Sequence, residues 1–131
     1  MDACVSHKKV CAITGASGFV GSYLAPLLAG EGWCVVPINR LDVDFNDASA
    51  LARFLLKHEI THIVHLAAES NPAGGQVGRF YDVNAFITAN MLEAAEKVNL
   101  LGRFLYVSAT SVYGNSDGSA QREEDHLKPL N

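Results

Sequence analysis

Three glycines at three-residue spacing make up the segment of this sequence best suited to binding chemistry. Gly15, Gly18 and Gly21 lie in the run TGASGFVG, which follows an apolar segment and opens a segment with helical periodicity. Glycine allows a tight turn and lets the backbone approach a ligand without a Cβ atom, and the N–H groups at a helix N-terminus attract phosphate. The spacing therefore predicts a loop that holds the pyrophosphate of a dinucleotide, the alternative being a glycine-rich turn that binds nothing.

Alternating strands and helices must position this loop. Short apolar runs bounded by turn residues predict buried strands, and apolar residues at three- and four-residue steps predict helices. The predicted strands are 10–14, 34–38, 41–43, 62–66 and 103–108, and the predicted helices are 19–30, 47–58 and 80–98. Pro26 conflicts with the first helix, and Asp47 or Ser49 can cap the second. The alternation predicts an α/β fold with a Rossmann-like parallel sheet in the order 3-2-1-4-5 and helices on both faces.

Length and composition restrict the class of protein. The chain has 131 residues, of which 49% are hydrophobic and 18% charged, and its net charge is -4. This length suits one domain and is too short for two. No apolar run approaches the roughly 18 residues that cross a bilayer, and no basic stripe marks a nucleic-acid partner. The first residues lack the features of a secretory signal, so the expected location is cytoplasmic.

The histidines and cysteines do not predict a metal site. His58, His62 and His65 fall at a predicted helix end and on both faces of a predicted strand, so their rings are not expected to converge. We expect His58 to cap a helix and His65 to be buried and hydrogen-bonded. The three cysteines lack metal-ligand spacing.

Three further motifs follow the glycine loop in order. THIVHLAA occupies residues 61–68, YDVNAFITANMLEAA occupies 81–95 and FLYVSATSVYG occupies 104–114. With the glycine loop, whose spacing is one residue wider than the standard dinucleotide fingerprint, they resemble the extended short-chain dehydrogenase/reductase superfamily over essentially the whole chain. This resemblance implies an NAD(P)-binding domain of an enzyme that acts on a nucleotide sugar as a reductase, epimerase or dehydratase. The segment 40–44 and the last motif resemble 4-dehydro-6-deoxy-sugar reductases, whereas GSYLA after the glycine loop resembles GDP-mannose 4,6-dehydratases.

The resemblance also implies which residues contact the cofactor. Phe19 and Val20 would offer backbone amides to the pyrophosphate, Asp44 and Phe45 would flank the adenine, and residues 66–68 would run beside the nicotinamide ribose. Asp44 has an alternative role as a turn carboxylate, because DFND is also turn chemistry. The complete set of predicted cofactor contacts is Gly15, Ser17, Gly18, Phe19, Val20, Gly21, Asn39, Arg40, Asp44, Phe45, Leu66, Ala67, Ala68 and Ser70.

Asn39 and Arg40 predict the choice of cofactor. An acid at the end of the second strand usually accepts a hydrogen bond from the ribose 2′-OH of NAD, and here that position is Asn39. Without a carboxylate there is no repulsion of a 2′-phosphate, and the Arg40 guanidinium can bind that phosphate through several donors. We therefore expect NADP, with NAD as the alternative if Arg40 is a solvated surface residue.

The catalytic part of the family's pattern is missing from this sequence. The resemblance implies a Tyr and a Lys in a Tyr-x-x-x-Lys sequence, and a Ser or Thr that holds the substrate oxygen. The chain has no such sequence and carries Ala109 at the Ser or Thr position. Thr110 and Ser108 are the remaining catalytic candidates, but in a regular strand they would point to the face opposite Ala109.

We expect residues 1–131 to be the N-terminal part of an NAD(P)-binding Rossmann domain whose C-terminal substrate-binding part is absent, and to be inactive alone. The alternatives are a non-catalytic dinucleotide-binding module and one half of a split enzyme. Without the sixth strand of the complete fold, residues 104–108 would form an unpaired edge. We therefore expect self-association or a missing C-terminal partner, with a nucleotide sugar as the substrate of the complete protein.

Overall fold

The apolar run at residues 10–14 forms β1 (Val10–Thr14) at the centre of a parallel sheet. In this computed structural model, which describes residues 8–69, 78, 81–115 and 118–129, every residue of β1 is buried. β2 (Cys34–Ile38) and β3 (His62–His65) pair with β1 from either side, and β4 (Phe104–Tyr106) pairs with β3. The strand order is β2-β1-β3-β4. A central strand is covered on both faces, which accounts for its continuous apolar run.

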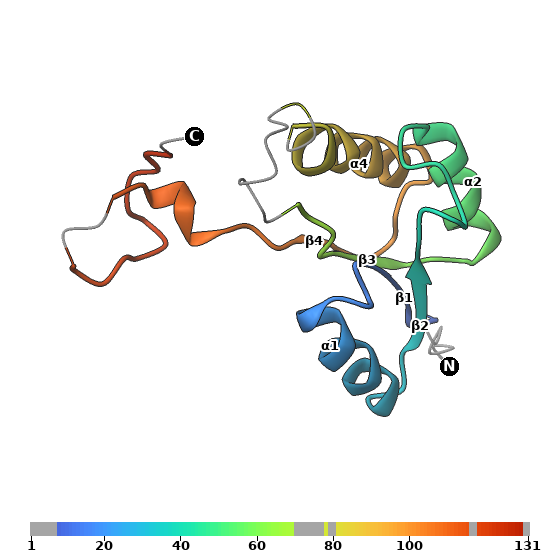
Figure 1. The fold of residues 1–131 in the computed structure, drawn as a ribbon. Helices are drawn as coiled ribbons and strands as arrows, with labels where there is room; N and C mark the ends of the chain where they lie inside the picture. The colour runs from blue at the N-terminus through green and yellow to red at the C-terminus, as the bar shows by residue number, and fades with distance from the viewer. Residues whose placement is uncertain (1–7, 70–77, 79–80, 116–117, 130–131) are drawn as a thin grey trace, which may run out of the picture.

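Helices cover both faces of the sheet (Figure 1). α1 (Phe19–Gly30) lies against β1 and β2 on one face, and α2 (Ala48–Lys57) and α4 (Ile87–Lys97) pack side by side on the other. The hydrophobic core lies between the sheet and these two helices, and its buried members include Leu51, Leu55, Ile63 and Met91. The predicted α/β fold, a Rossmann-like parallel sheet with helices on both faces, is confirmed.

Capping chemistry sets the boundaries of α2. The Asp47 carboxylate accepts hydrogen bonds from the backbone N–H groups of Ser49 and Ala50, at 2.8 and 3.0 Å. Asp47, one of the two predicted caps, therefore begins the helix, because these bonds satisfy N–H groups that have no acceptor within it. His58 is the C-cap, as predicted. Pro26 lies inside α1, which nevertheless continues to Gly30.

Three predicted strands need correction, of which 62–66 differs least because β3 ends at His65. Residues 41–43 form a turn, in which the Asp42 N–H donates to the Asn39 carbonyl oxygen at 3.0 Å. These local hydrogen bonds satisfy groups that a strand would have to pair with a neighbour. The sheet therefore keeps the predicted order without its outermost strand. β4 spans Phe104–Tyr106, where 103–108 was predicted, because its neighbour β3 ends at His65.

The predicted helix at 80–98 consists of two parts. Tyr81 is helical, residues Asp82–Phe86 form a π-helix, and α4 follows directly, whereas Phe80 lies outside the described residues. The Asn84 side chain accepts from the Glu69 N–H at 2.8 Å and donates to the Glu69 carbonyl at 3.0 Å. This pair of bonds fastens the π-helix to the segment that leaves β3. Short π-helical segments are frequent at functional sites.

The chain after β4 folds on itself away from the sheet (Figure 1). A 3-10 helix at Thr110–Tyr113 is followed by a return of the chain, in which the Lys128 N–H donates to the Val112 carbonyl at 2.9 Å. Within the ranges that the structure describes, no helix has both the length and the apolar character needed to cross a membrane.

Candidate functional site

The glycine loop joins β1 to α1 at the carboxyl end of the sheet. Gly15 has φ +70°, a left-handed conformation that other residues adopt only with strain. A Cβ atom at Gly15 would lie 2.9 Å from the backbone nitrogen of Ala67 and 3.1 Å from the carbonyl carbon of Leu66. Glycine is therefore required at position 15 for two reasons, which are its backbone conformation and the close approach of the segment that leaves β3.

The other two glycines of the loop have different roles. A Cβ atom at Gly21 would lie 2.3 Å from the Gly15 oxygen and 2.6 Å from the Ala16 Cα, so the helix contacts the loop backbone directly. The close contact at Gly21 is thus made between α1 and the loop that precedes it. Gly18 is exposed, and a Cβ atom there would meet the Gly15 oxygen at 3.2 Å. A ligand can therefore approach the backbone of Gly18 from the open side.

The N-terminus of α1 is free to bind an anion. It has no side-chain cap and no acidic residue in its first turn. The first N–H groups of a helix have no acceptor within it, and the helix dipole adds partial positive charge there. Phe19 and Val20 are 82% and 52% exposed, and Ser17 is also exposed. The structure thus brings the predicted loop residues together around a set of N–H donors.

A cavity of about 370 Å³ lies beyond the end of β2. Its lining includes three predicted contacts, Arg40, Asp44 and Phe45. Phe45 is 7% exposed, and its carbonyl oxygen accepts from the buried Asn90 side chain at 3.0 Å. The full lining is Arg40, Val43, Asp44, Phe45, Asn46, Asp82, Val83 and Ile87.

Asp44 has a turn role as well as its place in the cavity. Its Oδ1 atom accepts from the backbone N–H and the side-chain amide of Asn46, at 2.9 and 3.1 Å. The turn interpretation of DFND is therefore confirmed, and the same turn holds the Asp44 and Phe45 side of the cavity.

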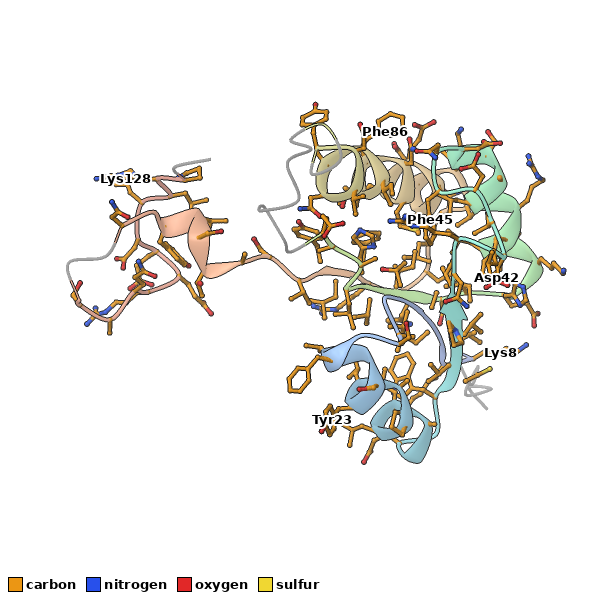
Figure 2. The ribbon with its side chains drawn as sticks, viewed as in Figure 1. Lys8, Tyr23, Asp42, Phe45, Phe86 and Lys128 are labelled. Atoms are coloured by element: carbon orange, nitrogen blue, oxygen red, sulfur yellow. The ribbon has the colours of Figure 1, made fainter. Side chains whose placement is uncertain are left out.

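The turn after β2 contains a carboxylate that sequence reasoning missed. This residue is Asp42, which is labelled in Figure 2. Its Oδ2 atom accepts from the Asn39 N–H at 3.2 Å and from the Asn39 side-chain amide at 3.0 Å. Arg40 is exposed and has no ion pair with any residue that the structure describes. The signal that could have found this arrangement is the Asn–Asp pair three residues apart, which is turn chemistry; the prediction of a strand at 41–43 concealed it.

The segment that leaves β3 completes the site. Leu66 and Ala67 donate their N–H groups to Thr14 Oγ1, at 3.2 and 3.1 Å, which holds them beside Gly15. Ala68 follows them and is exposed. The family resemblance implied a place beside the nicotinamide ribose for residues 66–68. Sequence reasoning missed Thr14, whose only local signal is a hydroxyl at the end of an apolar strand. Ser70 lies outside the described residues.

The two catalytic candidates lie beyond β4. Ser108 and Thr110 are both exposed, and neither hydroxyl has a hydrogen bond within the described part of the chain. Thr110 begins the 3-10 helix, so the alternation of a regular strand, on which the argument about their faces rested, does not extend to them. No hydrogen bond connects either residue with the glycine loop among the described residues.

His58, His62 and His65 contact other side chains of the protein. The His58 ring centroid lies 4.3 Å from that of Phe54, and the His62 ring lies 4.8 Å from Trp33. His65 is 1% exposed and hydrogen-bonded, as predicted. In the searched, described residues no three His, Cys, Asp or Glu side chains form a group that could hold a metal ion.

Comparison with known proteins identifies the family. The model of the NAD dependent epimerase/dehydratase family matches residues 11–131. The chain belongs to this family. It is 30% identical to the GDP-6-deoxy-D-mannose reductase of Pseudomonas aeruginosa, a match that covers 89% of this chain and 39% of that protein.

Solved structures of a reductase and an epimerase show the same fold. The dTDP-4-dehydrorhamnose reductase from Bacillus anthracis in complex with NADP has a TM-score of 0.83 and 24% identity, covering 95% of this chain and 44% of that one. UDP-glucose 4-epimerase from Brucella ovis in complex with NAD has a TM-score of 0.83 and 22% identity, covering 94% and 42%. This member of the NAD-dependent epimerase/dehydratase family thus spans less than half the length of these three proteins.

Proposed function

We propose that this chain binds NADPH and forms the cofactor-binding part of a reductase that acts on a 4-dehydro-6-deoxy nucleotide sugar. The observation that supports dinucleotide binding is the glycine loop at Gly15 and Gly18. There Gly15 lets the backbone of Ala67 come close to the loop, and the exposed Gly18 leaves the backbone open to a ligand in front of an uncapped helix N-terminus. The reductase is supported by the resemblance of segments 40–44 and 104–114 and by the 30% identity to a GDP-6-deoxy-D-mannose reductase.

Each part of the site has a proposed task. The amides at Phe19 and Val20 bind the pyrophosphate, the cavity at Phe45 takes the adenine, and Leu66–Ala68 lie along the nicotinamide ribose. Bound NADPH supplies a hydride to a carbonyl carbon of the sugar. The Arg40 guanidinium, which has no ion pair among the described residues, binds the 2′-phosphate.

Asp42 favours a second candidate, a preference for NADH. Its carboxylate is held next to Asn39, the position from which an acid accepts the ribose 2′-OH in NAD-binding proteins. A carboxylate at this point would repel a 2′-phosphate. The two candidates therefore differ in which charge of the turn determines the choice between NADPH and NADH, that of Arg40 or that of Asp42.

Paired titrations separate the candidates. Dissociation constants for NADPH and NADH are measured by calorimetry on the 131-residue chain and on Arg40→Ala and Asp42→Asn. If Arg40 decides, its loss weakens NADPH by about 10- to 100-fold and leaves NADH unchanged, because a charge-assisted hydrogen bond contributes about 1.5 to 3 kcal/mol. If Asp42 decides, the wild-type chain prefers NADH, and Asp42→Asn raises the affinity for NADPH. Failure of the wild-type chain to bind either dinucleotide refutes the proposed function.

A non-catalytic dinucleotide-binding module, or one half of a split enzyme, remains an alternative role for the same site. Its support is Ala109, which stands where the family resemblance implies a Ser or Thr. Adding a separately expressed C-terminal part of a related reductase tests the split enzyme, since restored turnover requires both chains. Binding of NADPH without turnover under all such conditions supports the module.

A further inference from the structure

A chain of buried and partly buried hydrogen bonds crosses the carboxyl end of the sheet from β1 to α4. The Thr14 hydroxyl lies 2.7 Å from Nδ1 of His65, and Nε2 of His65 lies 3.0 Å from the Thr88 hydroxyl. The Thr88 hydroxyl in turn donates to the Asn84 carbonyl oxygen at 3.0 Å. Thr14 is 0% exposed and His65 is 1% exposed, so water does not compete for the bond between them, whereas the two bonds of Thr88 are partly buried.

The protons of this chain can be assigned by counting donors and acceptors. Thr14 Oγ1 already accepts from the N–H groups of Leu66 and Ala67, so its own proton is directed to Nδ1 of His65. The Thr88 proton goes to Asn84, so Nε2 of His65 must carry the proton that it donates to Thr88. The network therefore assigns His65 as the neutral Nε2–H tautomer.

The network acts on the backbone that faces the proposed cofactor. Leu66 N–H has a second acceptor, the Thr14 carbonyl oxygen at 3.2 Å, whereas Thr14 Oγ1 is the acceptor for Ala67 N–H. The Ala67 nitrogen is also the atom that a Cβ on Gly15 would approach to 2.9 Å. Thr14 Oγ1, whose proton His65 accepts, therefore holds the Ala67 N–H where the glycine loop approaches the segment that leaves β3.

We propose that His65 is a positioning residue that, through Thr14, locks Ala67 against the glycine loop and so pre-organises the two backbone segments that bind the dinucleotide. This inference rests on the proposed function, because the segments matter only if a dinucleotide lies across them. The ring also contacts β4, with centroids 5.9 Å from Tyr106 and 6.1 Å from Phe104. Among these ring contacts Tyr106 is the one titratable side chain.

Four variants test the two ends of this lock, which are the hydrogen bond between His65 and Thr14 and the hydrogen bond between His65 and Thr88. His65→Asn can keep an acceptor near the Nδ1 position but cannot reach Thr88, and His65→Gln can reach Thr88 but loses the acceptor for Thr14. Thr14→Val removes the hydroxyl, and Thr14→Ser restores it. The matched control is His62→Gln on the same strand, whose ring packs on Trp33.

Two independent readouts keep the tests separate. Hydrogen exchange of the Ala67 amide, measured by NMR without ligand, reports the lock, and the Leu66 amide is an internal control because it keeps the Thr14 carbonyl. Calorimetry with NADPH measures whether the loss of this lock weakens cofactor binding. We expect Ala67 exchange about ten-fold faster and NADPH binding about ten-fold weaker in Thr14→Val and His65→Gln, the cost of one unpaired buried group. Thr14→Ser, His65→Asn and His62→Gln should stay within about three-fold of wild type.

The pH profile distinguishes positioning by the neutral ring from simple packing. Burial lowers the pKa of His65 from its ordinary 6.5, because the desolvated site disfavours the charged ring. The unfolded chain therefore binds the proton first as the pH falls. Stability from His65 is fully present above the unfolded value and is lost as the pH falls from there through the lowered folded pKa. Ala67 exchange in the wild type should accelerate over this range, beyond the change of intrinsic exchange, and should not do so in His65→Gln.

Each result has one interpretation. Unchanged Ala67 exchange in both Thr14→Val and His65→Gln overturns the lock, even if the variants are destabilised. Faster exchange with unchanged NADPH affinity shows that the lock exists but does not serve the cofactor, which also overturns the inference. If the wild-type chain binds no dinucleotide, the proposed function fails, and the exchange data still decide whether His65 fixes Ala67.

Discussion

Replacing Gly18 by Val should abolish cofactor binding and leave the fold intact. Gly18 has φ -74° and ψ 177°, a backbone conformation open to every residue, and a Cβ atom there would meet the Gly15 oxygen at 3.2 Å. The contact must relax by a few tenths of an ångström, and valine is a poor N-cap residue. We therefore expect a loss of about 1 kcal/mol in the free energy of unfolding. For a chain of this length that lowers Tm by about 4 °C.

The loss of binding should be far larger than the loss of stability. The branched side chain would stand where the pyrophosphate approaches the backbone, and it would move the phosphates away from the amides of Phe19 and Val20. A charge-assisted hydrogen bond contributes about 1.5 to 3 kcal/mol. The loss of two such bonds corresponds to at least about 100-fold weaker binding.

Calorimetry with NADPH and thermal melting followed by circular dichroism measure the two effects on the same sample. The matched control is Gly30→Ala in the same helix, where a Cβ atom would meet nothing within 4 Å. Its affinity should be unchanged, and its stability should be equal or higher by up to about 1 kcal/mol. Gly21→Ala is the contrasting variant, because its Cβ would lie 2.3 Å from the Gly15 oxygen; we expect a stability loss of about 1 to 3 kcal/mol. Wild-type affinity in Gly18→Val would show that the loop is only a turn.

Three further outcomes concern the cofactor, the reaction and the assembly. Arg40→Ala should weaken NADPH about 10-fold or more without affecting NADH, measured by calorimetry, and equal effects on both would remove Arg40 from the 2′-phosphate. The 131-residue chain should show no turnover of nucleotide sugars with NADPH, since a positioned proton donor contributes about 10² to 10⁴-fold; any measured turnover contradicts this. Sedimentation over a concentration series should show self-association through β4, whose Leu105 is 54% exposed, and a dilute monomer with a high Tm would contradict it.

The parts of the fold that were predicted correctly are those with a local cause. Residues 10–14 form a strand because a short apolar run flanked by lysines and a glycine has few alternatives. The α2 boundaries follow from the Asp47 cap and its neighbours in sequence. The glycine loop belongs to the same class, because the conformation of Gly15 is a property of that residue and of the turn it occupies.

Two of the features that were missed depend on contacts between distant residues. Thr14 and His65 are 51 positions apart, and no periodicity in either strand signals that their side chains meet. Asn84 and Glu69 are likewise joined across 15 positions, and Asn84 lies in the π-helix that stands at the start of the predicted helix. Registers between parallel strands decide such contacts, and a single sequence does not contain them.

The wrong strand at 41–43 shows how a local alternative alters the site. Residues 62–65 form β3 because β1 and β4 lie on either side to pair with their backbone groups. Residues 41–43 have Asn39 close by, and its carbonyl and side chain bond to Asp42 before any neighbouring strand is needed. The resulting turn sends the chain across the end of β2, which brings Arg40, Val43 and Phe45 to one cavity. A continuous outer strand would have spread these residues along the edge of the sheet. The proposed adenine site therefore depends on the same hydrogen bonds that remove the predicted strand.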